Sequence, residues 1–433
     1  MGHSATVESM IELTPETSVE DIKTHVNQWI DDHWELTLTV GEWWQKMLDA
    51  GLSHPMLPVN AYGQGWSRAQ AMAVGKVLAE RNVLGPPPGL GSMLAAPTIA
   101  EHGTQAQIDR YIPAILNGTE AWCQLFSEPN AGSDLASMAA RAERDGDEWR
   151  VTGQKVWTSG GQTADMGMLV ARTDPNQPKH RGLTYFAIDM HQDQVDIRPL
   201  IEMTGHAFFN EVFMEDAITS EDARIGDLGN GWRVANTTLM HERASIGAGG
   251  SGAPLAAAGS IANQLGREVG EFVTRKADGK SARRAMPGVG MRDWERLAET
   301  SRKLGMENDP NVRQRMTRLY SNISVNRWNT QRARQKSQRT GGEPNIAKLH
   351  DSALHHEFRE VGLSIVGAEG MLAVEGQMTN PSVGAMTLFS PGPSIYGGTN
   401  EIQKNIIGER VLGLPKEPGP DKSTPFSELA KNQ

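Results

Sequence analysis

Along its 433 residues, the sequence pattern changes from helical to β-rich and back to helical. This order of patterns limits the possible folds more than any single motif does. Residues 1–121 read mostly as helix, punctuated by turn signals such as the three prolines at 86–88. Residues 122–233 contain short runs rich in β-branched and aromatic residues, bounded by glycine and aspartate. The helical pattern returns over residues 234–414, and residues 415–433 form a Pro- and Lys-rich tail that we expect to extend over the surface. The order predicts a β domain inserted between two helical halves.

Three local patterns sharpen this division. Asp145 and Gly146 lie between two β-rich runs and predict the turn of a hairpin. In the first helical half we expect four tryptophans to anchor a core: Trp29, Trp34, Trp43 and Trp44. In the second half, apolar residues recur at steps close to three and four, which predicts an amphipathic helix. Its apolar stripe comprises Ile346, Leu349, Ala353, Phe358, Val361 and Ile365.

The bulk composition argues against several classes of partner and location. A net charge of −10 is unfavourable for binding nucleic acid or an anionic membrane. No run approaches the roughly 20 apolar residues of a transmembrane helix. The first 21 residues carry no lysine or arginine and no apolar core of a secretion signal. The single cysteine, Cys123, fits a reducing compartment. We therefore expect a cytoplasmic protein with no membrane span and no nucleic-acid partner.

Two segments of the β-rich region combine small residues, hydroxyls and an aromatic ring. Residues 122–136 read WCQLFSEPNAGSDLA, and residues 151–160 read VTGQKVWTSG. The AGS stretch of the first segment lets backbone amides approach a planar, electron-poor ring and its carbonyls. The hydroxyls of Ser127 and Ser159 can bond ring nitrogens and oxygens, while Trp157 can cover one face of the ring. This combination suits a planar, heteroaromatic cofactor.

A third motif occupies residues 394–415, which read SIYGGTNEIQKNIIGERVLGLP. This run resembles the C-terminal signature of the acyl-CoA dehydrogenase family. The two β-rich segments look like the flavin-embracing segments of the same family, at their usual separation. Residues 101–118 resemble the family's helix before the β domain, residues 209–216 its last β strand, and residues 229–232 the return to helix. The resemblance extends over most of the chain.

The resemblance implies an α+β multi-domain fold: an N-terminal helical domain (1–121), a central β-barrel domain (122–233) and a C-terminal four-helix bundle (234–414). It implies one FAD per subunit, shared across a dimer interface in a homotetramer. The implied reaction is α,β-dehydrogenation of an acyl-CoA to the trans-2-enoyl-CoA, with an electron-transferring flavoprotein as electron acceptor. The residues that it assigns to FAD are Gln124, Phe126, Ser127, Gly132, Ser133, Trp157, Thr158, Ser159, Arg302, Gly367, Thr399 and Glu401.

Gly397 departs from the family pattern at the position of the catalytic base. In many members a glutamate directly follows the tyrosine of the signature, whereas here Gly397 follows Tyr396. Members related to isovaleryl- and long-chain acyl-CoA dehydrogenases carry this glutamate on the first helix after the β domain, immediately before an arginine. Glu242 followed by Arg243 matches that alternative, so Glu242 is the predicted base. Gly397 keeps the backbone N–H that polarises the thioester carbonyl in the family. The residues assigned to substrate are Ser133, Met240, Arg243, Gly397 and Gly398.

Two further departures lie in the second helical half. The family grips the adenine half of FAD with an arginine, matched by Arg302, and with a Gln-x-x-Gly-Gly-type turn in which Ser364 replaces the glutamine. The passage from Arg243 to Arg302 spans 59 positions (302 − 243), longer than in typical relatives. We expect the excess, residues 266–293, to be a solvated excursion. The alternative is that its cations contact the CoA phosphates or a neighbouring subunit. These cations are Arg275, Lys276, Lys280, Arg283 and Arg284.

Two other functions stay open on the sequence alone. One is a non-catalytic subunit of a heterotetramer, which Gly397 and Ser364 favour and Glu242 opposes. The other is a flavin oxidase or monooxygenase on the same scaffold. No residue of the sequence indicates the length, branching or ring character of the acyl chain of the substrate.

Three patterns that suggest other chemistries are incomplete. The Gly-x-Gly-x-x-Gly spacing at residues 247–252 lacks the preceding strand that a dinucleotide site requires. His241 and Glu242 begin like a zinc-protease helix, but the second histidine is missing. His355 and His356 form an unaccompanied pair. The sequence therefore predicts no metal site.

Overall fold

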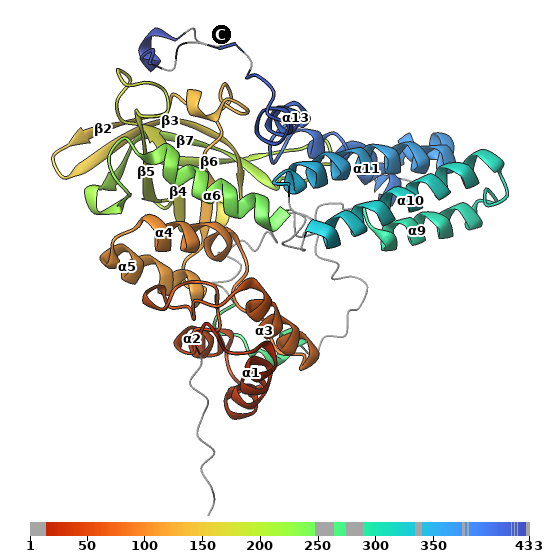
Figure 1. Ribbon diagram of the computed structural model, residues 1–433, viewed down its shortest axis with the longest axis horizontal. Helices are drawn as coiled ribbons and strands as arrows, with labels where there is room; N and C mark the ends of the chain where they lie inside the picture. The colour runs from red at the N-terminus through yellow and green to blue at the C-terminus, as the bar shows by residue number, and fades with distance from the viewer. Residues whose placement is uncertain are drawn as a thin grey trace, which may run out of the picture.

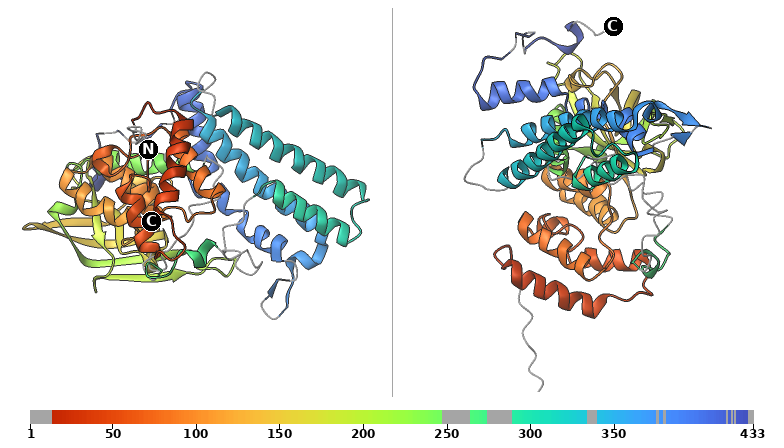
Figure 2. Two further views of the ribbon diagram at one scale, coloured as in Figure 1. Left: turned by 90° about the horizontal axis from the view of Figure 1, so that it is seen from below. Right: turned by 90° about the vertical axis from the view of Figure 1, so that its right-hand side faces the viewer.

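A computed structural model of the chain describes residues 14–246, 264–273, 289–333, 340–374, 377–378, 381–416, 418–419, 421 and 423–429. Figure 1 shows N-terminal helices on one side of a twisted β sheet and a bundle of long helices that projects away from the sheet. The second view in Figure 2 shows the C-terminal segment on the opposite side of the sheet from the N-terminal helices. The predicted order of helical, β and helical parts is confirmed, and with it the α+β class.

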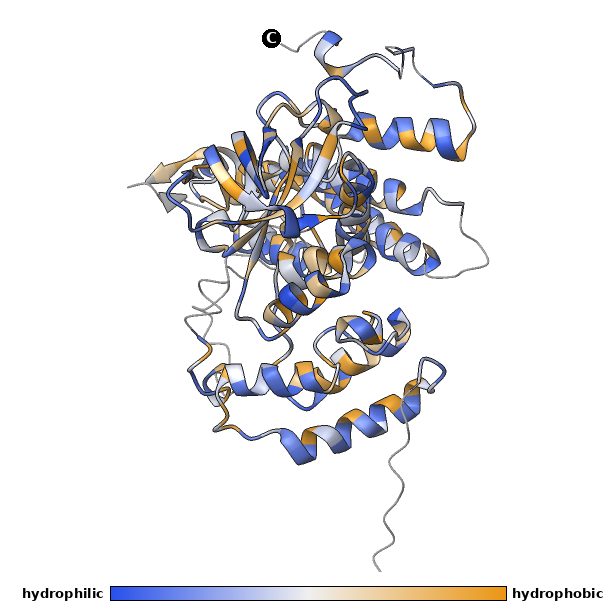
Figure 3. Ribbon diagram, turned by 90° about the vertical axis from the view of Figure 1, so that its left-hand side faces the viewer, coloured by the Kyte–Doolittle hydropathy of each residue, from blue (hydrophilic) through white to orange (hydrophobic). Residues whose placement is uncertain are grey.

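The N-terminal part consists of short helices packed around tryptophans. They are η1 (Val59–Ala61), η2 (Gly91–Ala95), α1 (Val19–His33), α2 (Val40–Asp49), α3 (Arg68–Glu80), α4 (Ala96–His102) and α5 (Gln105–Leu116). Thr39, Ser67 and Thr104 each close a capping box at the start of a helix. The four tryptophans pack in one core, as predicted, with Trp43 and Trp44 buried. Figure 3 shows hydrophobic and hydrophilic residues interspersed along these helices, as expected for helices that pack one face in a core.

The β domain is one mixed sheet whose two faces border different cores. Its strands are β1 (Trp122–Leu125), β2 (Arg141–Asp145), β3 (Glu148–Ser159), β4 (Met166–Arg172), β5 (Leu183–Asp189), β6 (Val195–Leu200), β7 (Phe209–Ser220) and β8 (Arg224–Ile225). They run in the order β6-β7-β3-β2-β4-β5-β8, with β1 parallel to β4. The predicted hairpin is confirmed, because β2 and β3 pair up to Asp145 and Glu148, and Gly146 takes a φ of 66° in the turn.

Strand β4 shows how the sheet joins the N-terminal helices. It is buried along its whole length. Met168 and Val170 pack in the core shared with the N-terminal helices, whereas Leu169 and Ala171 pack in the inner core of the sheet. Because alternate side chains enter both cores, the β domain and the N-terminal helices form one rigid support.

The bundle is built from α9 (Met291–Lys303), α10 (Pro310–Ala333), α11 (Glu343–Val366) and α12 (Pro381–Phe389). Phe358, Val361 and Ile365 lie in its core, which confirms the second half of the predicted stripe. All six stripe residues lie on α11, as predicted, but the first half of the stripe lies outside this core. Ile346 and Ala353 are exposed and line a groove beside α10 together with Leu349, because the stripe turns away from the bundle core there. Across the described ranges, no helix is both long and apolar enough to cross a membrane.

Residues 264–273, which end in α8 (Gly270–Val273), pack against the N-terminal helices. The Val40 N–H donates to the Arg267 carbonyl over 2.8 Å, and the Val269 N–H donates to the Leu38 carbonyl over 2.8 Å. Val269 is fully buried in the tryptophan core. The predicted solvated excursion is therefore wrong for residues 266–273, because their apolar side chains complete that core. The five cations of the excess, and the glycine pattern at 247–252, lie outside the described residues.

Candidate active site

Ser127 and Val156 bring the two predicted cofactor segments side by side. The Val156 N–H donates to the Ser127 carbonyl oxygen over 2.9 Å. The register of β3 against β7 slips between Lys155 and Thr158, and within this bulge Trp157 takes a φ of 61°, which is uncommon for an aromatic residue. The bulge leaves Trp157 55% exposed. Backbone strain of this kind persists where the surroundings impose it, and it is frequent at ligand sites.

The two segments carry a buried hydroxyl and a stretch of exposed small residues. Among the residues that the structure describes, the Thr158 hydroxyl is buried without a hydrogen-bond partner. Gly132 and Ser133 are exposed, and a Cβ on Gly132 would meet nothing within 4 Å. The Phe126 ring is buried in the core against Tyr185, so only the backbone of this residue could contact a cofactor. A buried hydroxyl without a partner and an open backbone fit the polar edge of a planar cofactor.

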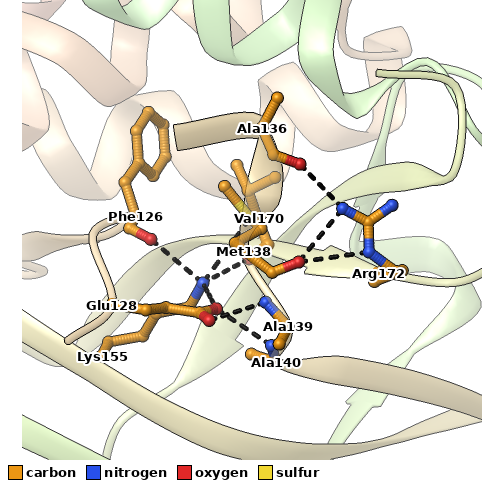
Figure 4. Close-up of polar contacts among 9 residues, drawn as sticks. All are labelled: Phe126, Glu128, Ala136, Met138, Ala139, Ala140, Lys155, Val170 and Arg172. Atoms are coloured by element: carbon orange, nitrogen blue, oxygen red, sulfur yellow. Dashed lines mark hydrogen bonds and ion pairs between the residues drawn. The ribbon is translucent and has the colours of Figure 1, made fainter. Parts of the chain in front are cut away.

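A buried ion pair joins the two segments (Figure 4). Lys155 is fully buried, and its Nζ donates to Glu128 Oε1 over 2.8 Å, to the Val170 carbonyl over 2.8 Å and to the Phe126 carbonyl over 3.1 Å. Glu128 also accepts the backbone N–H groups of residues 139–140. Burial lowers the pKa of Lys155, and the Glu128 carboxylate opposes that shift. Because Glu128 belongs to the first segment and Lys155 to the second, the pair fixes one against the other.

Glu242 lies on α6 (Gly231–Ile246), the first helix after the β domain, next to the first cofactor segment. The Gln124 side-chain Nε2 donates to Glu242 Oε2 over 3.4 Å. Burial raises the pKa of the Glu242 carboxyl, while the Gln124 hydrogen bond and the Arg243 charge oppose the shift. A carboxyl with a raised pKa suits a proton-abstracting base that works near neutral pH.

Threonines one turn earlier hold α6 in place. Thr238 Oγ1 shares a hydrogen bond with Thr98 Oγ1 over 2.9 Å and with the Tyr185 hydroxyl over 3.3 Å. Thr237 Oγ1 lies 2.7 Å from His102 Nε2. These contacts tie α6 to α4 and β5, so Glu242 is presented from a rigid element.

The turn at Gly397 and Gly398 requires glycine. Their φ values are 66° and 86°, and a Cβ on Gly398 would lie 2.7 Å from Gln403 Nε2. Gln403 is buried; its Nε2 donates to the Gly397 carbonyl over 2.8 Å, and its Oε1 accepts from Asn345 Nδ2 over 2.6 Å. The turn is thus pinned to α11, in a left-handed conformation that strains any residue with a side chain.

Four other predicted residues lie on α6 or near the start of α13 (Asn400–Ile406). Met240 and Arg243 are exposed on α6. The Thr399 hydroxyl caps α13 by accepting the Ile402 N–H over 3.2 Å, and Glu401 is exposed in the first turn. Ser159 is half-buried at the end of β3. Although Arg243 is exposed in part, the burial of the rest of its side chain lowers its pKa, and the charge of Arg410 adds to this shift while Glu242 opposes it.

Arg302 and Gly367 are not brought to the cofactor segments within this chain. Arg302 is exposed in the last turn of α9, and Gly367 directly follows α11. Both helix ends lie at the end of the bundle remote from the sheet (Figure 1). Ser364, which stands where the family has a glutamine, donates its hydroxyl to the Val361 carbonyl over 2.8 Å.

The paired histidines have partners inside the fold. His355 Nδ1 lies 2.8 Å from the Asp351 carbonyl, and His356 Nε2 lies 2.8 Å from Ser394 Oγ. Within the described part of the chain, no group of three or more His, Cys, Asp or Glu side chains is placed to hold a metal ion.

Sequence reasoning missed two contacts that organise this site. Glu128 lies in the first cofactor segment and Lys155 in the second. These opposite charges in two segments that are predicted to meet could have indicated a buried ion pair. The Gln124–Glu242 contact joins residues 118 positions apart and has no local signal.

Three family models match the chain: the acyl-CoA dehydrogenase N-terminal domain over residues 6–119, the middle domain over residues 123–217 and the C-terminal domain over residues 288–412. The chain belongs to the acyl-CoA dehydrogenase family. Acyl-CoA dehydrogenase IpdE1 of Mycobacterium tuberculosis is 35% identical to it over 376 residues, which cover 87% of this chain and 88% of the relative.

Solved structures share the fold of this acyl-CoA dehydrogenase. The Tcur3481–Tcur3483 steroid ACAD aligns with a TM-score of 0.65 at 22% identity, over 94% of this chain and 100% of that chain. The ChsE4–ChsE5 complex from Mycobacterium tuberculosis aligns with a TM-score of 0.63 at 22% identity, over the same shares of both chains. The protein is accordingly an oxidoreductase that acts on acyl-CoA, in a family of flavoproteins.

Proposed function

We propose that this acyl-CoA dehydrogenase binds FAD and converts an acyl-CoA thioester to its trans-2-enoyl-CoA, with Glu242 as the base that removes the α-proton. The placement of Glu242 carries the proposal. Its carboxylate is held against Gln124 of the first cofactor segment, and burial raises its pKa. Gly397 stands where many members have their base, and its left-handed backbone suits a residue without a side chain.

The surrounding residues have separate roles in this proposal. When bound, FAD supplies the acceptor for the hydride that leaves the β-carbon. Trp157 would cover the ring, while the Thr158 and Ser159 hydroxyls and the backbone around Gly132 would bond its polar edge. The Gly397 N–H would polarise the thioester carbonyl, which stabilises the charge that develops as Glu242 takes the proton. Burial holds the pKa of Glu242 above its usual range, and a bound substrate that displaces water would raise it further.

Two parts of the bundle surface support an assembly of several chains. A groove beside α10, along the first half of α11, combines apolar and polar side chains and suits the surface of a further subunit. It is lined by Asn322, Ile346, Leu349, His350, Ala353, Leu354 and Glu357. Arg302 and Gly367 lie remote from their own chain's cofactor segments, which fits a cofactor shared between subunits. We propose a homotetramer in the cytoplasm that passes electrons to an electron-transferring flavoprotein. A heterotetramer is the alternative, because structural relatives include the two-component ChsE4–ChsE5 complex.

Turnover of a panel of acyl-CoA esters with an artificial electron acceptor tests the reaction. Wild type should bleach its flavin with at least one ester and form the enoyl product. Glu242→Gln should retain FAD and lose roughly 10²- to 10⁴-fold in rate, the usual contribution of a positioned base. Glu80→Gln, an exposed acid on α3, is the matched control and should behave as wild type.

Three results would change the proposal. Unaltered bleaching by Glu242→Gln would show that another group is the base. A yellow wild-type protein inert to every ester would favour the non-catalytic subunit, and rapid reoxidation by air would favour an oxidase.

A further inference from the structure

The C-terminal segment, residues 423–429, folds back onto the β domain rather than trailing over the surface. The Phe426 N–H donates to the Gln177 carbonyl over 3.0 Å, and the Ser427 N–H donates to the Pro175 carbonyl over 2.9 Å. Figure 1 shows the end of the chain beside the loops of the sheet. The family's C-terminal model ends at residue 412, so the segment itself lies outside the three matched domains, whereas the loop to which it docks belongs to the matched middle domain.

Phe426 covers a buried arginine. The Arg172 guanidinium lies over the Phe426 ring, with its central carbon 3.4 Å from the ring centroid. Arg172 is only 4% exposed, and burial lowers its pKa to about 10 against the attraction of Glu128. A desolvated cation over an aromatic face is a stabilising contact, and the ring keeps water from the guanidinium.

Arg172 connects this cover to the first cofactor segment. Its Nη2 donates to the Ala136 carbonyl over 2.8 Å, and its Nε donates to the Met138 carbonyl over 3.1 Å (Figure 4). These carbonyls lie between Gly132 and the backbone amides that bind Glu128. Arg172 therefore fixes the stretch that follows the exposed small residues of the cofactor segment.

The loop to which the segment docks makes a second connection. Lys179, two residues after Gln177, places its Nζ 2.7 Å from both carboxylate oxygens of Asp134. Asp134 directly follows Ser133. The C-terminal segment thus acts on the cofactor segment by two routes, through Arg172 and through the loop that carries Lys179.

We propose that residues 423–429 form a C-terminal clasp that holds residues 127–139 in the conformation that binds flavin, with Phe426 as a positioning residue that acts through Arg172. The inference rests on the proposed binding of FAD. In this proposal Phe426 acts on the cofactor segment indirectly: its ring packs on Arg172, and Arg172 in turn binds the Ala136 and Met138 carbonyls. Loss of the clasp should therefore loosen flavin before it loosens the fold.

Release of flavin from the diluted holoenzyme, followed by the rise in flavin fluorescence, tests the clasp. Phe426→Ala should release FAD roughly tenfold faster, the size expected for loss of a desolvated cation–π contact. Phe426→Trp should restore slow release, because it keeps an aromatic face for Arg172. Phe272→Ala is the matched control: it removes a half-buried ring under Arg267 in residues 264–273, which pack against the N-terminal helices, and it should leave flavin release unchanged.

Thermal unfolding of the same variants separates positioning from general stability. If Phe426→Ala and Phe272→Ala release FAD at rates that simply follow their unfolding midpoints, the clasp is only a structural contact and the proposal is overturned. It is also overturned if Phe426→Ala releases FAD as slowly as wild type. A wild-type protein purified without FAD would instead contradict the proposed function on which the clasp rests.

Discussion

The two halves of the active site are organised differently. The β half, with its two cofactor segments and Glu242, is assembled within one chain by buried hydrogen bonds, from the Lys155–Glu128 pair to the Thr98–Thr238 contact. The bundle half presents Arg302 and Gly367 at an exposed end, away from those segments. Under the proposed function, this difference means that the subunit alone would pre-organise the chemistry, whereas binding of the outer part of FAD would depend on assembly. Substitutions in the first half should act inside the subunit, and those in the second should act only in the oligomer.

The largest effect on the β half is expected from Lys155→Met. The change leaves the Glu128 carboxylate buried without its cation, which should cost about 3–5 kcal/mol of stability and lower the FAD content. Denaturant unfolding with flavin analysis measures both. Lys76→Met on the exposed face of α3 is the control, with an expected change within about 0.5 kcal/mol. Equal stability of the two variants would show that the buried pair does not organise the segments.

Gly398→Ala tests the glycine turn before α13, which Gln403 and Asn345 hold against α11. The new Cβ meets Gln403 Nε2 at 2.7 Å and forces a side chain into a left-handed backbone, a cost of about 1–2 kcal/mol. We expect weaker acyl-CoA binding, measured by titration, with FAD content unchanged. At Gly408 a Cβ would make only an ordinary 3.6 Å contact with Leu414, so Gly408→Ala is the matched control. If Gly398→Ala instead loses FAD and keeps its affinity for acyl-CoA, the turn serves the cofactor and not the substrate.

The pH dependence of kcat/KM reports the environment of Glu242. The base must be ionised, and burial raises its pKa, so the rate should fall with decreasing pH at a higher pH than for an ordinary glutamate. Gln124→Leu removes a hydrogen bond that lowers this pKa and should move the acid limb further upward. If the acid limb of the Gln124→Leu variant stays at the wild-type pH while its FAD content is normal, Gln124 does not influence the base.

Arg302→Ala should give the smallest effect. Because the side chain is exposed within the chain, we expect subunit stability to change by less than about 0.5 kcal/mol. Flavin release from the assembled protein should become a few-fold faster, which is the size of effect expected when one charge-assisted hydrogen bond is lost. Arg296→Ala, on the same helix and also exposed, is the control. A clear loss of subunit stability would mean that the bundle half is organised inside the chain after all.

The sequence predicts the β half better than the bundle half, for a physical reason. Ser127, Trp157 and the hairpin at Asp145 are parts of continuous segments whose chemistry is local. Ile346 and Ala353 show the opposite case: their helical spacing is correct, but spacing alone does not say whether a face meets the core or a further subunit. The contacts of Gln124 with Glu242 and of Phe426 with Arg172 join distant residues, so only the fold reveals them.

A substrate analogue whose α-proton is acidic but which cannot pass on a hydride tests the central claim most directly. A 3-thiaacyl-CoA bound to the oxidised holoenzyme should lose its α-proton to Glu242 and form a long-wavelength charge-transfer band. In Glu242→Gln holoenzyme with normal FAD content, we predict that the analogue binds without this band. A band of wild-type intensity in the variant would contradict the assignment of Glu242 as the base.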